Sequence, residues 1–218
     1  MSTSFQLRNE AAAIWTAQLE HPLVLGIGDG TLDPGKFAFW LRQDYLFLID
    51  YSRALACAAL RAPDLATMTA FANLLSETVT TEMDLHRSYV SEFGITEVDL
   101  EQEPTHPTTR AYTNFLLRVA STGSYPDLVA ALLPCMWGYS DVGQTLQSRG
   151  MPDDGRYAQW IAMYAAPEFA DLAGWCRTLL DSLTDGVPSE GLTSVKAAFL
   201  TSCQYELDFW EMAWSAPL

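Results

Sequence analysis

Cys135 and Tyr139 are the two side chains whose types and spacing are best suited to chemistry. Residues four apart share one face of a helix, so a thiol and a phenol would lie side by side on the apolar run that contains them. Pro134 removes the N–H that would bond to the carbonyl of Ala130, and we expect a helix kink there. This combination indicates the wall of a pocket. The alternative is a cysteine that only fills the core, because free cysteine is among the most buried residue types.

Two carboxylates, Asp44 and Glu206, occur in strongly apolar stretches. Burying a carboxylate costs several kcal/mol unless it is paired. Asp44 could be solvent-exposed instead, and Asp208 competes with Glu206 to be the exposed acid of the segment Tyr205–Trp210. If both carboxylates point inward, a thiol and several tyrosines beside them could bind a polar heteroaromatic ring and move protons on it.

Metal and phosphate chemistry find little support in the sequence. His21, His86 and His106 are the only histidines, and a di-iron site of the helical type needs a Glu-x-x-His motif on each of two helices. The sequence has one such motif, Glu103–His106, and it lies in a proline-rich segment. The four cysteines are far apart and form no CxxC pair. The glycine-dense segment Gly26–Thr31 matches no phosphate-binding fingerprint, and we expect it to be a turn between helices. We therefore expect no metal and no cofactor.

The apolar spacing is helical almost throughout, which predicts an all-α chain. Prolines and short polar segments separate long amphipathic runs, so we expect antiparallel neighbours in one helical domain covering residues 1–218. Ser124 and Asp127 resemble a capping box at one of the helix starts. The predicted helices are Ser4–Glu20, Gly35–Arg61, Leu65–Phe93, Thr108–Ala120, Tyr125–Arg149, Tyr157–Tyr164, Glu168–Leu183 and Pro188–Trp214.

Charge and hydropathy exclude several partners. The 218 residues include 12 Lys and Arg against 27 Asp and Glu, a formal net charge of −15. Nucleic acids and anionic membranes need a basic footprint, so neither is expected as a partner. The longest uncharged stretch, Leu128–Ser140, is too short to span a bilayer, and no signal peptide is recognised. We expect a cytoplasmic protein.

Six segments together resemble the TenA/thiaminase II family, in order and at close to the expected spacing. A single one of them would be a weak signal, whereas six in register are a strong one. They are the run His21–Leu32, the pair Gln43-Asp44, Glu82–His86, Leu133–Tyr139, Trp160–Tyr164 with Phe169, and Tyr205-Glu206 with Phe209-Trp210.

The resemblance implies a haem-oxygenase-like helical bundle without haem, usually a homotetramer. Family members with a cysteine at the position of Cys135 hydrolyse 4-amino-5-aminomethyl-2-methylpyrimidine to the hydroxymethyl compound, a salvage step for thiamin, and can also split thiamin. Cys135 matches the nucleophile, Glu206 the acid that binds a ring nitrogen, and Asp44 the carboxylate that binds the amino-pyrimidine edge. The aromatic groups matched to the pocket are Phe47, where the family often has tyrosine, Tyr112, Tyr139 and Tyr164.

Three other functions stay open at this point. The first is a cofactorless or metal-dependent oxidase on the same bundle, which the absence of histidine from the second half of the chain disfavours. The second is a transcriptional regulator, which a chain of net charge −15 without a basic stripe disfavours. The third is a non-catalytic protein that binds pyrimidines or thiamin.

Overall fold

The computed structural model describes residues 2–92 and 94–217, and those residues contain helices and no strand. The predicted all-α class is therefore confirmed. Two compact units make up the chain: the first comprises Met1–Asp33 and Val129–Pro217, the second Pro34–Leu128. The expectation of one domain over residues 1–218 stays a prediction. None of the helices in the described part of the chain has the length and apolar character needed to cross a membrane.

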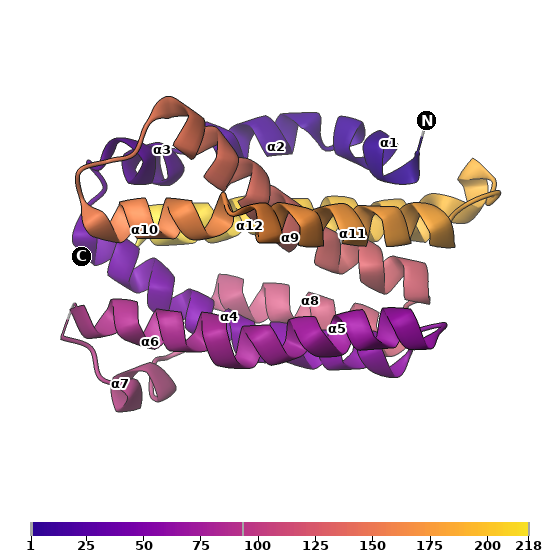
Figure 1. Ribbon diagram of the computed structural model, residues 1–218, viewed down its shortest axis with the longest axis horizontal. Coiled ribbons are helices and arrows are strands. Elements are labelled where there is room, and N and C mark those ends of the chain that lie inside the picture. The colour runs from indigo at the N-terminus through magenta and orange to yellow at the C-terminus, as the bar shows by residue number, and fades with distance from the viewer. Residues whose placement is uncertain (1, 93, 218) are drawn as a thin grey trace. The chain divides into compact units, whose positions relative to one another are not determined.

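The second unit is built on α4 (Pro34–Leu60), which packs against α5 (Leu65–Glu77) and α8 (Pro107–Thr122). From α5 the chain continues without a break through the π-helix η1 (Thr78–Glu82) into α6 (Met83–Glu92), and the three form one long rod (Figure 1). The predicted helix over this stretch is confirmed in outline, with a π-helix in its middle. Its predicted end at Phe93 lies outside the described residues.

Side-chain caps fix where helices of this unit begin. The Asp64 carboxylate accepts a hydrogen bond from the Thr67 backbone N–H at 2.8 Å and starts α5. Thr96 and Asp99 form a reciprocal capping box before the short helix α7 (Glu97–Glu101). This helix was not predicted, because five residues are too few to show a helical period.

The first unit gathers helices from both ends of the chain. Within it, α12 packs against α2 and α3, and α1 packs against α11. Trp15 of α2 stacks on Phe199 of α12, with ring centroids 6.3 Å apart. The elements are α1 (Thr3–Glu10), α2 (Ala12–Leu19), α3 (Pro22–Asp29), α10 (Gly155–Tyr164), α11 (Pro167–Leu183), the 3₁₀-helix η2 (Ser189–Leu192) and α12 (Thr193–Ser215).

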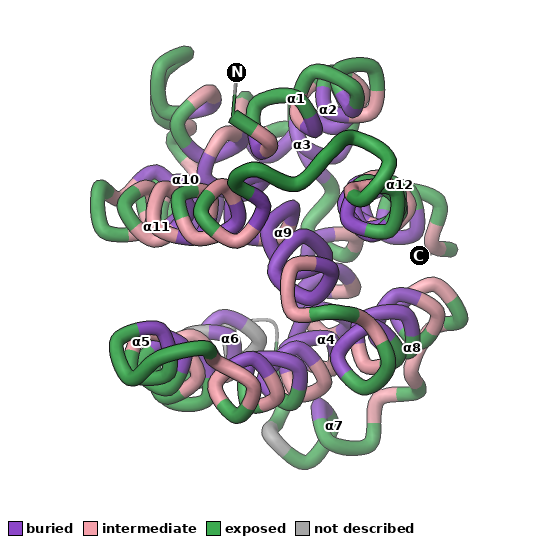
Figure 2. The backbone as a smooth tube through the Cα atoms, turned by 90° about the vertical axis from the view of Figure 1, so that its right-hand side faces the viewer, coloured by how far each residue is buried: buried purple, intermediate pink, exposed green. Residues whose placement is uncertain are grey.

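Helix α9 (Tyr125–Arg149) begins in the second unit, lies in the first from Val129 onward, and has the predicted bounds. The predicted capping box is also present, because the Ser124 N–H donates to Asp127 and the Asp127 N–H donates to the Ser124 hydroxyl. Most of α9 is buried (Figure 2). The helix continues through Pro134, and the Ser202 hydroxyl of α12 donates to the nearby Ala131 carbonyl at 2.7 Å.

Two predictions about the N-terminal region were wrong. The expected single helix from Ser4 to Glu20 is interrupted at Ala11, whose ψ of 5° lies well away from the helical value of about −42°. The expected turn over Gly26–Thr31 is largely the helix α3, which ends at Gly30 with a φ of 76°. Gly28 serves packing instead, since a Cβ atom there would lie 2.7 Å from a methyl carbon of Leu146.

Candidate active site

Asp44 of α4 and His86 of α6 form a buried pair in the second unit. Asp44 is 5% exposed and His86 1% exposed, and Nε2 of His86 lies 2.7 Å from Oδ2 of Asp44. The expectation that Asp44 points inward is confirmed. Nδ1 of His86 lies 2.9 Å from the Glu82 carbonyl oxygen, which can only accept, so Nδ1 carries a proton.

The charge state of His86 follows from two opposing effects. Burial alone lowers the pKa of His86, because a charged imidazole loses its hydration. The hydrogen bond and charge of Asp44, together with Glu82, act in the other direction and hold the pKa of His86 above its ordinary value. The pair therefore favours a protonated imidazole at His86.

The aromatic ring of Phe47 lies one turn further along α4 from this carboxylate, and two other rings pack against it. The rings of Phe47 and Tyr112 have centroids 4.9 Å apart, and Phe47 stacks on Tyr51 at 5.4 Å. Phe47 and Tyr112 are 3% and 1% exposed. These rings offer the kind of flat, apolar surface on which a heteroaromatic ligand stacks.

Gln43, which precedes Asp44, fixes the start of α8 and thereby the helix that carries Tyr112. Its side-chain oxygen accepts from the backbone N–H of His106 and from the Thr109 hydroxyl, each at 2.9 Å. Its amide nitrogen donates to the carbonyl of Pro104 at 3.1 Å. Gln43 is fully buried, and all of these bonds lie within the protein, so its role is positional.

Glu206 is the buried carboxylate of the first unit. Its exposure on α12 is 2%, whereas Asp208 is half-buried and accepts from Gln204 on the exposed side of the helix. The prediction that Glu206 rather than Asp208 points inward is confirmed. Burial and the charge of Glu206 both raise the pKa of the neighbouring thiol, Cys203. A charge at Glu206 is thus felt inside the core.

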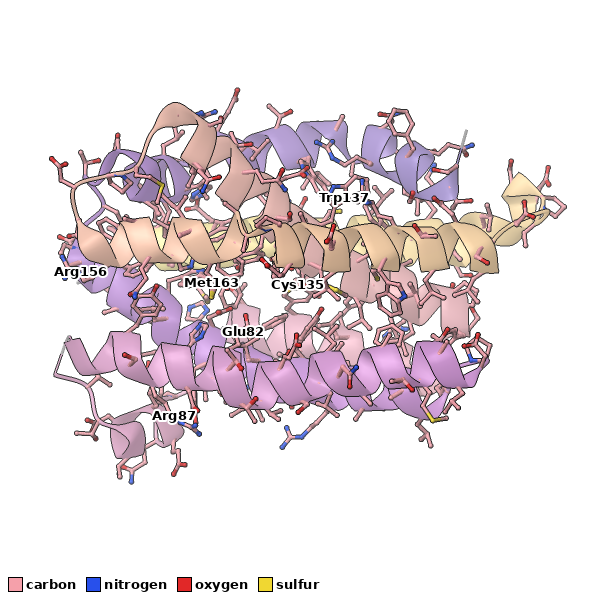
Figure 3. The ribbon with its side chains drawn as sticks, in the orientation of Figure 1. Glu82, Arg87, Cys135, Trp137, Arg156 and Met163 are labelled. Atoms are coloured by element: carbon pink, nitrogen blue, oxygen red, sulfur yellow. The ribbon has the colours of Figure 1, made fainter. Side chains whose placement is uncertain are left out.

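Cys135 differs from the cysteines that fill the core. Cys176 and Cys203 are buried, whereas Cys135 is partly exposed on α9. Burial raises the pKa of Cys176 to about 12, which leaves it an inert thiol. Figure 3 shows Cys135 and Trp137 projecting from different sides of α9. Trp137 packs instead against Trp15 of α2, with ring centroids 5.2 Å apart.

Tyrosine and tryptophan rings cluster around Tyr139 in the first unit. Tyr139 lies 4.9 Å from Tyr164 and 5.1 Å from Trp210, measured between ring centroids. Tyr164 in turn contacts Trp160 at 4.8 Å and Phe169 at 5.2 Å. The structure therefore brings together Tyr139 and Tyr164, which the sequence analysis had placed in the same pocket.

Each unit thus holds one group of the predicted residues. Asp44, Phe47 and Tyr112 lie in the second unit, while Cys135, Glu206 and the two tyrosines lie in the first. Sequence reasoning missed one candidate, His86, although it ends one of the six segments that carry the family resemblance. Over the described ranges, no cluster of three or more His, Cys, Asp or Glu side chains is arranged to hold a metal ion.

Comparison with known proteins agrees across sequence and structure. The family model described as TENA/THI-4/PQQC family matches residues 8–216. A protein of Halalkalibacterium halodurans named aminopyrimidine aminohydrolase is 44% identical over 216 residues, which are 99% of this chain and 96% of the relative.

Solved structures of the same architecture are also found. A TenA homologue from P. horikoshii OT3 superposes with a TM-score of 0.91 at 30% identity, covering 98% of this chain and 99% of the other. A domain of unknown function with a heme oxygenase-like fold, from Shewanella denitrificans, superposes with a TM-score of 0.74 at 17% identity, over 96% of this chain and 91% of the other. The second likeness concerns the fold alone.

Proposed function

The chain belongs to the TENA/THI-4/PQQC family, and we propose that it hydrolyses aminopyrimidines in thiamin salvage. The proposed substrate is 4-amino-5-aminomethyl-2-methylpyrimidine, which gives the hydroxymethyl compound and ammonia, with thiamin as a second substrate. The main support is the full-length likeness to a protein named aminopyrimidine aminohydrolase, together with the burial of both expected carboxylates. The expected fold, a haem-oxygenase-like bundle, is shared with the solved relatives.

The proposed roles follow the types of the residues. Asp44 accepts a hydrogen bond from the amino group of the ring, and the rings of Phe47 and Tyr112 bind its face. Tyr139 and Tyr164 form the wall of the pocket around the 5-substituent of the ring. None of these roles requires a metal ion or a cofactor.

The proposed reaction uses Cys135 as the nucleophile and Glu206 as the proton carrier. Glu206 protonates a ring nitrogen, which makes the ring electrophilic, and the Cys135 thiolate adds to a ring carbon. Electrons return through the ring and break the bond between the 5-methylene carbon and its amino group, which takes up a proton and leaves as ammonia. Water then adds to the methylene carbon, and the proton that it loses replaces the one taken up by the amine. The thiolate departs and the ring nitrogen returns its proton to Glu206, which restores the aromatic ring. This role needs Glu206 in its protonated form when the substrate binds.

The test is ammonia release from the aminomethyl pyrimidine by purified protein, followed alongside thiamin cleavage. We expect Cys135→Ser to abolish ammonia release, because a hydroxyl is a far weaker nucleophile than a thiol. Cys57→Ser is the matched control, since Cys57 is the other partly exposed cysteine and lies outside the proposed machinery. Near-normal turnover by the Cys135 variant would exclude the nucleophile role, and an inactive wild-type protein would exclude the proposed reaction.

The assembly state and location belong to the same proposal. We propose a cytoplasmic homotetramer, with support from the family resemblance alone. Light scattering on the purified protein should give four times the chain mass of 24.2 kDa. A mass of one or two chains at micromolar concentration would contradict it.

A further inference from the structure

The Asp44–His86 pair contains a single shared proton, and its place can be worked out from the acceptors around it. Because the Glu82 carbonyl can only accept, Nδ1 of His86 is always a donor. The 2.7 Å contact between Nε2 and Oδ2 of Asp44 then holds one proton. Either the imidazolium donates to a carboxylate, or a carboxylic acid donates to the neutral ring.

The same argument shows that Oδ1, the other carboxyl oxygen of Asp44, carries no proton. In both states the shared proton lies on the line between Nε2 and Oδ2, so Oδ1 carries none. Among the described residues, His86 is the hydrogen-bond partner of Asp44, and Oδ1 makes no such bond. Oδ1 can therefore only accept a hydrogen bond from a ligand.

We propose that His86 is a positioning residue that keeps Asp44 a pure hydrogen-bond acceptor, so that Asp44 selects a ring bearing an amino group over one bearing an oxo group. An amino N–H donates to Oδ1, whereas an oxo oxygen would face it acceptor to acceptor. Two facing acceptors leave the buried oxygen unsatisfied, which is costly. The inference rests on the proposed function and adds the residue that determines which ring is accepted.

The surroundings of His86 hold the imidazole in this orientation. Its ring is anchored at both nitrogens, by the backbone of η1 on one side and by α4 on the other. The Trp40 ring lies 6.3 Å away, centroid to centroid. The ionisable groups that act on His86 are the carboxylates of Asp44 and Glu82, and both favour the protonated ring. A rigid, doubly bonded imidazole fixes which oxygen of Asp44 it binds.

The experiment compares binding of two ligands that differ at one position. Titration calorimetry measures the affinity of 4-amino-5-hydroxymethyl-2-methylpyrimidine and of its 4-oxo analogue. In the wild-type protein we expect the amino compound to bind more tightly. In His86→Phe the buried carboxyl group of Asp44 loses its partner, and a proton that it then takes up can occupy either oxygen, so we expect the amino/oxo preference to fall by about tenfold or more. His86→Gln retains a donor toward Asp44, and we expect it to restore most of the preference.

A second measurement reads the proton directly and needs neither substrate nor activity. The chain has three histidines, so ¹⁵N spectra of His-labelled protein can be assigned by comparing wild type with His86→Gln and His106→Asn. We expect Nδ1 of His86 to stay protonated from pH 6 to pH 9, and Nε2 to shift when Asp44 is replaced by Asn.

The outcomes separate this inference from the proposed function. An unprotonated Nδ1, or an unchanged amino/oxo preference in His86→Phe, would overturn the role of His86 even if the wild-type enzyme is active. Absence of turnover in the wild type would count against the proposed reaction, while the spectra would still decide where the proton lies. If His86→Phe fails to fold, an amino/oxo preference in His86→Gln equal to that of Asp44→Asn would also overturn the inference. His106→Asn, which keeps a capping acceptor at the start of α8, should behave as wild type.

Discussion

Gly143 of α9 lies directly against the backbone of Tyr164, at the end of α10. A Cβ atom at Gly143 would be 2.6 Å from the carbonyl carbon of Tyr164 and 2.6 Å from the backbone nitrogen of Ala165. Backbone atoms cannot swing aside as the end of a flexible side chain can. Because Gly143 has no side chain, the end of α10 can lie close to α9. The Tyr164 ring can then approach Tyr139, which is on α9 together with Gly143.

We expect Gly143→Ala to destabilise the protein by about 1–3 kcal/mol, the usual cost of forcing atoms into a packed core. Urea unfolding followed by circular dichroism measures this free energy. Gly138→Ala on the same helix is the control, because its nearest neighbour would be the Gln18 side-chain oxygen at an ordinary 3.7 Å. There the better helix propensity of alanine should leave the stability equal or higher. Equal stability changes in the two variants would contradict the argument.

Thiol reactivity should divide the four cysteines into two classes. Cys57 and Cys135 are partly exposed, whereas Cys176 and Cys203 are buried and their thiol pKa values are raised by burial. Because only the thiolate reacts, iodoacetamide at pH 8 should label the first two and spare the others until the protein unfolds. Mass spectrometry of the digested protein identifies the labelled sites. Early labelling of Cys176 would show that the core around it opens.

Glu206 and Asp208 provide a matched pair of acids on α12. Glu206 is buried and Asp208 is half-buried beside Gln204. We expect Glu206→Gln to lower kcat by a factor of about 10² to 10⁴, because an amide keeps the shape but carries no proton for the ring nitrogen. Asp208→Asn should change kcat less than threefold. Equal losses in the two variants would indicate an effect of surface charge instead.

His21 should make the protein less stable in mild acid. The Leu23 N–H donates to Nδ1 of His21, so the single ring proton lies on Nε2, toward Glu211. Burial lowers the pKa of His21 more than the hydrogen bond and charge of Glu211 raise it. The folded state therefore takes up the second ring proton at lower pH than the unfolded chain does. Stability should fall as the pH drops below the unfolded value of about 6.5, by at most about 1.4 kcal/mol per pH unit.

The comparison for His21 is His21→Asn, which keeps a capping acceptor at the start of α3 and cannot titrate. Its free energy of unfolding, measured in urea between pH 5 and pH 7.5, should fall less steeply toward acid than that of the wild type. Parallel pH profiles would mean that other groups determine the acid sensitivity.

The helices that the sequence predicts well are the ones with clear end signals. Ser124 and Asp127 mark the start of α9, and its predicted and observed bounds agree. Gly28 was misread, because a glycine inside a helix looks the same in sequence as a glycine needed for a turn. The π-helix Thr78–Glu82 was not expected either, since a local change of helical pitch has no distinctive composition.

Burial of the two candidate acids could also be predicted. Asp44 and Glu206 both stand in apolar helical surroundings, and each proves to be almost fully buried. The partner of Asp44 could not be predicted, because His86 is 42 residues away in the chain and only the packing of α6 on α4 brings the two together. A helical period shows which side of a helix is inward but not what it meets there.

The segment Thr78–Glu82 is a π-helix, whose turn is wider than that of an α-helix. The rod of α5, η1 and α6 therefore contains one residue more than a plain α-helix that spans the same distance. In a continuous α-helix, one added residue would turn everything after it by about 100°. The wider π turn takes up that residue locally, so α5 and α6 keep the faces that a plain α-helix would present, and His86 still meets Asp44. The Asp44–His86 contact is therefore compatible with two segment lengths: relatives that lack one residue here and have a plain α-helix are expected to retain both members of the pair.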